Sequence, residues 1–329
     1  MAVYRRREWT GMKIHAQQGH YGYIIVASTL LFGSTFPATK AVLREMTPLW
    51  AVSLRFSVAA LSIYPFLLWR SLLRESAMTP GPRAWKVIFA VGVLQTAGAM
   101  GFLNLGLRST SAPKAAILMA CTPLMVALIS SLFFKEKIRA LALVGLALSF
   151  CGVVLCIGPG SLAHGRFGPG DGLVLCGALC WSAATLIVKR AKVAIDIVLL
   201  SFWQMLIGAL LLAVLAMLGG EAFAAPRSAP VWLAFLWLAI PATGGALALW
   251  FLALRLGGAV QTSGFLFLSP LFASIIAFFL YGDVLRPLEL AGGVLIGFGI
   301  YLGSKGAGAA RAQDAKFATP SGPGRPRAG

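Results

Sequence analysis

Apolar residues run in long blocks along this chain, and polar residues gather in the short stretches between the blocks. A transmembrane helix needs about 20 consecutive, predominantly apolar residues. Ten blocks reach or approach that length, at 21–39, 49–68, 87–107, 111–134, 140–157, 172–188, 197–218, 231–254, 258–281 and 288–302. They lack the alternation of a β-barrel wall and are about twice as long as its strands. The pattern therefore predicts an all-α integral membrane protein with ten transmembrane helices.

Composition and charge agree with this prediction. Hydrophobic residues make up 59% of the chain and charged residues 12%, with a mean hydropathy of +0.84, whereas about a quarter of the residues in a soluble domain are charged. If the N-terminus is cytoplasmic, 20 Lys and Arg fall on the cytoplasmic side and 7 on the other. The positive-inside rule favours this orientation and predicts that both termini are cytoplasmic. It also accounts for the net charge of +18 without a nucleic-acid partner.

The chain contains an internal duplication. A shift of 147 residues, without a gap, superposes identical residues in the two halves. The pairs are Pro123 with Pro270, Thr96 with Thr243, Gly98 with Gly245, Arg108 with Arg255, Gly145 with Gly292 and Gly152 with Gly299. Self-similarity at a fixed spacing indicates a repeated structural unit.

Each repeat holds five predicted helices, and five is odd, so the second repeat must enter the membrane upside down relative to the first. Inverted repeats of this kind are a common transporter plan, with the substrate site near the bilayer midplane between them. The predicted organisation is a basic cytoplasmic N-tail (1–20), a first repeat (21–158), a connecting loop (159–171), a second repeat (172–304) and a disordered basic C-tail (305–329).

Two prolines lie near the middle of matching helices. Pro123 and Pro270 each remove a hydrogen bond to the carbonyl four residues back and kink the helix. We expect these kinks, together with Pro37 in the first block, to shape a cavity and to contribute to gating, although a bend used only for packing is an alternative. The flanking Thr122 and Ser269 are candidates to bond back into their own helices.

Polar and tryptophan side chains near mid-span are the candidate substrate-binding residues. Buried amides without partners are costly in hydrocarbon, so Gln95 and Asn104 should face the bundle interior. For these residues contact between helices is the alternative role, and for the tryptophans the alternative is an interfacial belt. The candidate set is Thr35, Thr39, Gln95, Thr96, Asn104, Trp181, Thr185, Thr243, Trp250 and Ser263.

Charged residues are almost missing from the blocks. No Asp or Glu lies inside one, and carriers coupled to protons usually keep such a group within the membrane. We therefore expect facilitated transport without a proton-carrying buried acid. Arg55 is the one basic residue inside a block; it could snorkel to an interface or pair with backbone carbonyls. Five cysteines and three histidines form no ligand cluster, so neither a metal nor a cofactor is expected.

Over nearly its whole length, the sequence resembles the EamA-type, ten-helix branch of the drug/metabolite transporter superfamily. The matching residues are Phe32 to Phe36 and Lys40, Pro48, Arg55 and Phe56, Thr110 to Ala112, Ala115 and Ala116, Pro123 and Leu124, Glu136, Trp181, Lys189, Gln261 to Ser263, Pro270 and Asp283. The resemblance implies a multi-pass carrier of the bacterial inner membrane, close to exporters of amino acids, including aromatic ones.

The predicted function is therefore outward transport of small metabolites, foremost aromatic or hydrophobic amino acids, by alternating access. A carrier for a drug, a nucleotide sugar or a phosphate ester is the alternative, and a membrane-embedded enzyme or a scaffold is less favoured. Expected partners are a small-molecule substrate and the lipid bilayer, with the chain a monomer or a homodimer.

Overall fold

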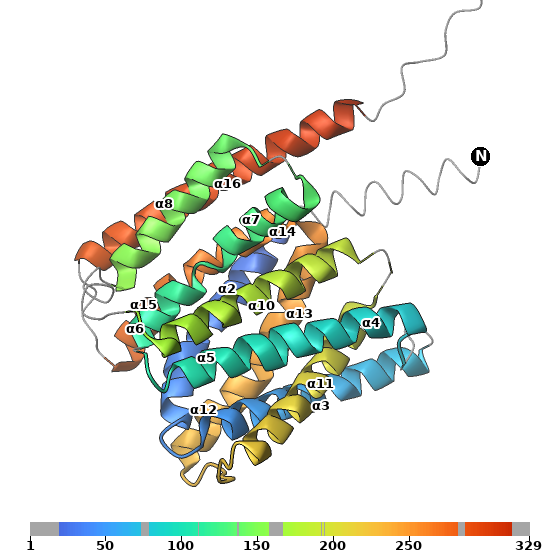
Figure 1. Cartoon of the computed structure of the whole chain (residues 1–329), viewed down its shortest axis with the longest axis vertical. Helices are drawn as coiled ribbons and strands as arrows, with labels where there is room; N and C mark the ends of the chain where they lie inside the picture. The colour runs from blue at the N-terminus through green and yellow to red at the C-terminus, as the bar shows by residue number, and fades with distance from the viewer. Residues whose placement is uncertain are drawn as a thin grey trace, which may run out of the picture.

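Helices form all of the regular structure in the residues that the structure, a computed structural model, describes: 20–73, 79–110, 112–136, 138–157, 167–191, 193, 195–281 and 287–317. In chain order the first half contains α2 (Tyr21–Val42), α3 (Pro48–Leu72), α4 (Pro82–Val91), the π-helical η1 (Gly92–Met100), α5 (Gly101–Gly106), α6 (Ala112–Met119), α7 (Thr122–Phe134) and α8 (Ala140–Ile157) (Figure 1). The second half contains α10 (Pro169–Arg190), α11 (Ile197–Leu218), α12 (Ala229–Ala239), the π-helical η2 (Ile240–Gly245), α13 (Ala246–Leu256), α14 (Ala259–Gly264), the 3₁₀ turn η3 (Phe265–Phe267), α15 (Leu268–Tyr281) and α16 (Pro287–Phe317).

The helices have the length and composition of membrane spans. Within the described residues, eight helical stretches are long and apolar enough to cross a bilayer, and shorter apolar stretches lie at Tyr21–Thr35 and Leu290–Gly303. Large apolar side chains cover the outside of the bundle, as in Phe279, which is 78% exposed, and Val294, which is 75% exposed. Such faces suit lipid and not water. The prediction of an all-α membrane protein is confirmed.

Two spans contain a π-helical segment at matching places. η1 lies between α4 and α5, and η2 lies between α12 and α13. The 147-residue shift carries η1 onto residues 239–247, which overlap η2. Pro241, the second residue of η2, has no N–H to donate, and the hydroxyl of Thr243 donates to the carbonyl of Leu238 at 2.7 Å. Segments of this type loosen the regular ladder and often mark functional sites.

Both helices with a central proline are interrupted, as the sequence predicts. The first breaks at residues 120–121, and Pro123 lies at the start of α7. The Thr122 hydroxyl donates to the Met119 carbonyl at 2.7 Å, so it does bond back into the chain just before it. The second passes through η3 before α15. The same expectation was wrong for Ser269, whose hydroxyl donates instead to the Thr29 carbonyl of α2 at 3.4 Å.

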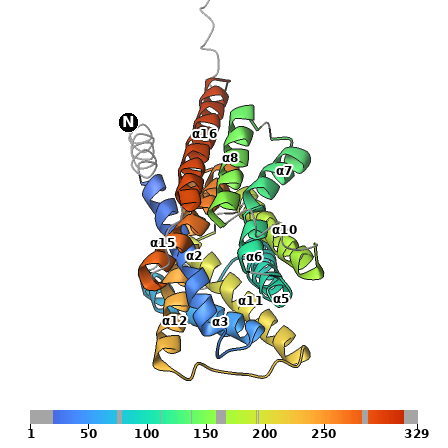
Figure 2. The same cartoon turned by 90° about the vertical axis from the view of Figure 1, so that its left-hand side faces the viewer.

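Glycines allow α8 and α16 to pack backbone to backbone, and the pair lies at one edge of the bundle (Figures 1 and 2). A Cβ atom built on Gly152 would lie 2.7 Å from the Gly292 carbonyl oxygen, and one on Gly145 would lie 2.5 Å from that of Gly299. Between these contacts, Ser149 donates to the Ile296 carbonyl at 3.3 Å. Because numbers rise along α8 as they fall along α16, the two helices are antiparallel.

Two element boundaries differ from the predicted ones. α10 begins at Pro169, three residues before 172, because Asp171 accepts the Gly168 N–H at 2.7 Å and caps the helix end. α16 extends to Phe317, beyond the predicted end of the repeat at 304. Its alanines extend an existing helix without a new nucleation step.

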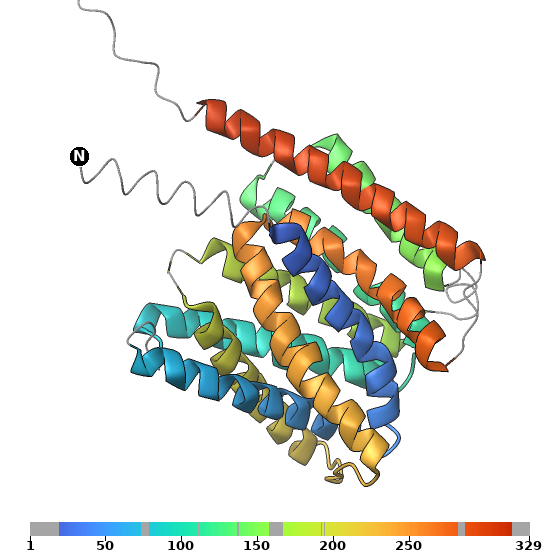
Figure 3. The same cartoon turned by 180° about the vertical axis from the view of Figure 1, so that it is seen from behind.

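The start of α2 and the end of α16 both lie toward the upper left of Figure 3; we call this side the N face.

Candidate functional site

Buried amide side chains from both halves of the chain lie in the interior of the bundle. Gln95 and Thr96 lie on η1, and Gln204 lies on α11; they are 1%, 0% and 0% exposed. The Thr96 hydroxyl donates to Gln204 Oε1 at 2.6 Å. Gln204 was not among the predicted site residues, although a lone amide inside the apolar block 197–218 was the available signal.

Three aromatic rings, from three different helices, meet in the interior of the bundle. Phe32 of α2 lies with its ring centroid 5.7 Å from Trp181 of α10 and 6.2 Å from Trp250 of α13, and the two indoles are 6.1 Å apart. Trp181 is 8% exposed and Trp250 is fully buried. An interfacial belt is therefore the wrong interpretation for both tryptophans. The rings belong to the same large hydrophobic core as Ala97 of η1 and Met205 of α11.

Several buried polar atoms of this region have no hydrogen-bond partner in the described part of the chain. They are Gln95 Nε2 and Oε1, Gln204 Nε2, Asn104 Oδ1, Trp181 Nε1 and Trp250 Nε1. Most buried polar atoms in proteins are paired with protein or water, since an unpaired one costs about 1–3 kcal/mol. These atoms are therefore donors and acceptors that a polar ligand or water can satisfy. Two of them belong to Trp181 and Trp250, which form an aromatic wall with Phe32. No carboxylate or metal-ligand cluster is found among the described residues.

Arg55 of α3 makes a contact that neither sequence expectation named. Its Nε–H donates to the Thr243 hydroxyl at 2.5 Å, and its Cζ atom lies 5.4 Å from the Phe56 ring centroid. Thr243 is 1% exposed, so the guanidinium points into the bundle at this contact. It neither snorkels outward nor bonds a backbone carbonyl in the described residues. The duplicated threonines Thr96 and Thr243 thus each pair with a polar side chain from the neighbouring helix of the other half.

The sequence signature described as the EamA-like transporter family matches twice, at residues 21–158 and 168–304. This chain belongs to the EamA-like transporter family. The match covers both halves and, with the apolar helices, establishes a multi-pass membrane transporter. Family membership favours a transporter over an enzyme.

Relatives of this transporter carry similarly general names. A chloroplastic WAT1-related protein of Arabidopsis thaliana is 24% identical over 287 residues, which are 85% of this chain and 68% of the relative. An uncharacterized transporter of Archaeoglobus fulgidus is 25% identical over 85% of this chain and 95% of its own. The uncharacterized transporter YoaV of Bacillus subtilis is 25% identical, covering 84% and 94%. A crystal structure with 18% identity superposes with a TM-score of 0.74 over 89% of this chain and 99% of the other, which shows the fold alone.

Other predicted site residues of this EamA-like transporter bond within their own helices. Thr35 donates to the Phe32 carbonyl at 2.7 Å, Thr185 to the Trp181 carbonyl at 2.9 Å and Ser263 to the Val260 carbonyl at 3.1 Å. The Asn104 amide likewise donates to the Met100 carbonyl at 2.8 Å. The hydroxyl hydrogens of Thr35, Thr185 and Ser263 are thus already used in hydrogen bonds, although each hydroxyl oxygen can still accept one.

The last of the predicted substrate-binding residues lies near the end of α2. Thr39 is half-buried in the last turn of α2. The side chains of Pro37 and Lys40 and the whole of Asp283 also appear in the sequence analysis, and they lie outside the described residues.

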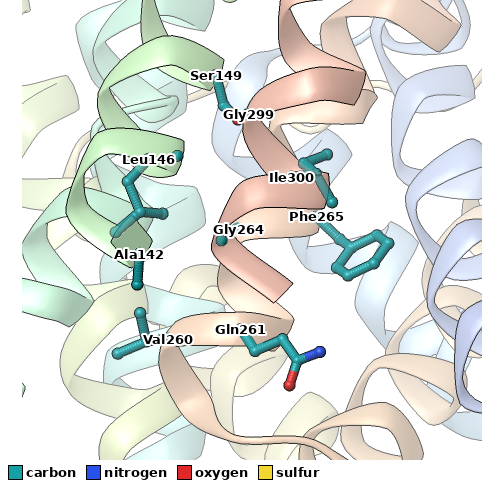
Figure 4. Close-up of a pocket in the computed structure, with 11 residues that line it drawn as sticks. Ala142, Leu146, Ser149, Val260, Gln261, Gly264, Phe265, Gly299 and Ile300 are labelled. Carbon is teal, nitrogen blue, oxygen red and sulfur yellow. The ribbon is translucent and has the colours of Figure 1, made fainter. Parts of the chain in front are cut away.

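A cavity of about 250 Å³ opens near the N face, between α10, α11 and α13. Its lining includes Lys189, Phe251 and Arg255, and the Lys189 ammonium donates to the carbonyls of Leu254 and Gly257. Phe251 of the lining precedes the last turn of α13, which also carries Leu254 and Arg255 of the lining. A second cavity, between α8, α14 and α16, holds about 30 Å³ (Figure 4). Gln261, Phe265, three aliphatic side chains and several glycines and other small residues line it. It is large enough for about one or two waters and not for a metabolite.

Carboxylates hold the loops together on the face opposite the N face. Glu221 accepts the Leu49 N–H at 2.9 Å and pairs with Arg108. Glu45 accepts hydrogen bonds from the Arg227 N–H at 2.5 Å and from the Ser228 hydroxyl at 2.7 Å. These bonds, the Arg227 N–H first, lower the pKa of Glu45 below its usual value. The described loops on this side are tied together, while the larger cavity lies on the other side.

Proposed function

We propose that this EamA-like transporter carries small amphipathic metabolites, foremost amino acids with aromatic or hydrophobic side chains, outward across the bacterial inner membrane by alternating access. The observation that carries the proposal is the set of buried polar atoms on Gln95, Gln204, Trp181 and Trp250 that lack a partner among the described residues, together with the contact of both tryptophans with the Phe32 ring. Ligand sites typically combine an apolar, aromatic lining with a few orienting polar groups. An amino acid offers both an apolar side chain and hydrogen-bonding ends.

The contacts between α8 and α16 support a two-fold relation between the halves. Gly145 meets Gly299, the equivalent of Gly152, and Gly152 meets Gly292, the equivalent of Gly145. Ser149 meets Ile296, its own equivalent. A self-complementary exchange of this kind is what a two-fold axis produces. For antiparallel helices that axis lies in the membrane plane, as in inverted-repeat transporters.

The distribution of charge supports facilitated transport. The described acidic side chains lie in loops or at helix ends: Glu45, Glu136, Asp171, Asp196 and Glu221. No acid in this part of the chain is placed to carry a proton through the span interior. With the N face cytoplasmic, as the basic residues favour, the 250 Å³ cavity near Lys189 is the cytoplasmic entrance. The oligomeric state we propose is a monomer or a homodimer.

Counterflow in proteoliposomes tests this function. Vesicles preloaded with unlabelled L-phenylalanine, L-tryptophan or L-leucine should accumulate the labelled amino acid in a saturable way. Trp250→Phe keeps an aromatic ring but removes the unpartnered N–H, and it should raise the half-saturation concentration roughly 2- to 10-fold, the effect of one lost hydrogen bond. Trp232→Phe is the matched control, since Trp232 is 42% exposed on the outside of the bundle.

Two results would contradict the proposal. One is that none of the aromatic or aliphatic amino acids exchanges while a different solute does. The other is that Trp250→Phe and Gln95→Leu both leave the half-saturation concentration at the value of the Trp232→Phe control.

A further inference from the structure

We infer that Arg55 and Thr243 form a binding subsite for a monocarboxylate, at which the acidic group of the transported solute docks; this inference rests on the proposed function. Arg55 lies seven residues into α3, which is about 10 Å from the start of the helix at 1.5 Å per residue. The hydrocarbon core is about 30 Å thick. The guanidinium therefore lies well inside the span, where ionisable side chains are rare and usually functional.

The described carboxylates do not neutralise this arginine. Each of them has other partners: Glu45 bonds residues 227–228, Glu136 pairs with Arg190, Asp171 bonds Thr110 and Gly168, Asp196 pairs with Arg70, and Glu221 pairs with Arg108. Arg55 itself has one hydrogen bond, to a neutral hydroxyl. Within this part of the chain, the charge of Arg55 thus lacks a counter-charge.

The geometry of the single bond leaves the recognition edge open. A guanidinium carries five N–H donors in a planar fork. Thr243 takes the Nε–H, and the donors on Nη1 and Nη2 have no partner among the described residues. These two nitrogens are the edge that binds the two oxygens of a carboxylate in parallel. The Thr243 hydroxyl is itself fixed by its bond to the Leu238 carbonyl, so it holds the fork in place.

The equivalent pair of helices in the other half is joined by a neutral hydrogen bond. In the other half, the equivalent threonine, Thr96, is satisfied by the neutral amide of Gln204. η1 and α11, the helices equivalent to η2 and α3, are thus joined without a cation, and the residue equivalent to Arg55 is Phe202. One cation also suits one carboxylate better than a phosphate ester, whose second negative charge would remain uncompensated in a medium of low dielectric constant.

The spacing to the aromatic wall suits an amphipathic solute. Trp250 lies seven residues after Thr243 along η2 and α13, about two helical turns or about 10 Å. A carboxylate on Arg55 and an aromatic side chain near Trp250 and Phe32 would lie at opposite ends of one small molecule. The order along the span places the acidic group toward the face opposite the N face.

Two paired probes test the subsite. In counterflow, L-phenylalanine should have a half-saturation concentration about tenfold or more below that of L-phenylalaninamide, because the amide lacks the charged acceptor. In detergent, phenylacetate should raise the thermal unfolding midpoint, and phenylacetamide at the same concentration should raise it less. Arg55→Gln should abolish both differences. Arg55→Lys should retain part of them, because an ammonium supplies charge without the fork. Arg83→Gln, at an exposed arginine, should leave them unchanged.

The outcomes separate the subsite from the transport function. If the wild-type protein exchanges phenylalanine but treats each acid and its amide alike, the subsite is overturned and the proposed function stands. If no amino acid exchanges, yet phenylacetate stabilises the protein only when Arg55 is present, the subsite stands and the proposed function fails. The acid and amide comparison in the wild-type protein needs no variant, so misfolding of Arg55→Gln does not affect it.

Discussion

The backbone contact between α8 and α16 makes a quantitative prediction for a single added methyl group. A Cβ at position 152 would lie 2.7 Å from the Gly292 carbonyl oxygen and 2.8 Å from the Ile296 backbone nitrogen and side chain. Ordinary van der Waals contact begins at 3.4 Å. Gly152→Ala must therefore move the two backbones apart by about 0.7 Å, and rigid backbone atoms cannot rotate away as a flexible side chain would.

The expected cost exceeds the gain from a better helix former. Overpacking a tight contact costs about 1–3 kcal/mol, while Gly→Ala inside a helix contributes about 0.5–1 kcal/mol of stability. We therefore expect a net loss of up to about 2 kcal/mol for Gly152→Ala. Gly292→Ala tests the same contact from α16, because a Cβ at position 292 would lie 2.6 Å from the Gly152 carbonyl oxygen. Once the helices have separated for one methyl group the second fits more easily, so the double variant should lose less than the sum of the two singles.

The assay is thermal or denaturant unfolding of the purified protein in detergent, followed by tryptophan fluorescence. Gly297→Ala on α16, the helix of Gly292, is the control, because nothing lies within 4 Å of a Cβ built there; it should be neutral or slightly stabilising. If Gly152→Ala is as stable as Gly297→Ala, the close approach of α8 and α16 is wrong. Full additivity of Gly152→Ala and Gly292→Ala would exclude a shared contact.

Two further predictions concern the hydrogen bond between Thr96 and Gln204 and the hydrogen bonds of Glu45 in the loops. Gln204→Leu should destabilise the protein by about 1–3 kcal/mol, because it leaves the buried Thr96 hydroxyl without its acceptor, and the Gln204→Leu, Thr96→Val pair should recover part of that loss in an unfolding double-mutant cycle. Glu45 has a folded pKa below its usual value of 4.5, so the stability it contributes is fully present above about pH 4.5 and is lost as the pH falls through the lower folded pKa. Glu45→Gln should accordingly flatten the acid side of the stability profile measured by unfolding, and an unchanged acid slope would count against the bonds to residues 227–228.

Local sequence was enough to predict much of this transporter. The lengths of the apolar blocks predicted the transmembrane helices, because the thickness of the bilayer sets the length of a helix that crosses it. Pro123 gave a helix break because a proline cannot donate the backbone bond. Gln95 and Asn104 were expected to be buried inside the bundle, and at 1% and 6% exposed they are. These predictions depend only on what each residue requires of its own helix.

Contacts between distant helices could not be predicted in this way. Thr96 bonds Gln204 across 108 positions and Arg55 bonds Thr243 across 188. The meeting of Phe32, Trp181 and Trp250 also depends on how three helices are rotated against one another. The sequence of an apolar helix does not show which of its faces is buried. Only packing decides which face turns inward and which neighbouring helix it contacts. The chain alone therefore determined that the protein spans a membrane as a duplicated set of helices, while the tertiary structure decided which polar groups lie together, because hydrogen bonds and ring contacts require proximity in space.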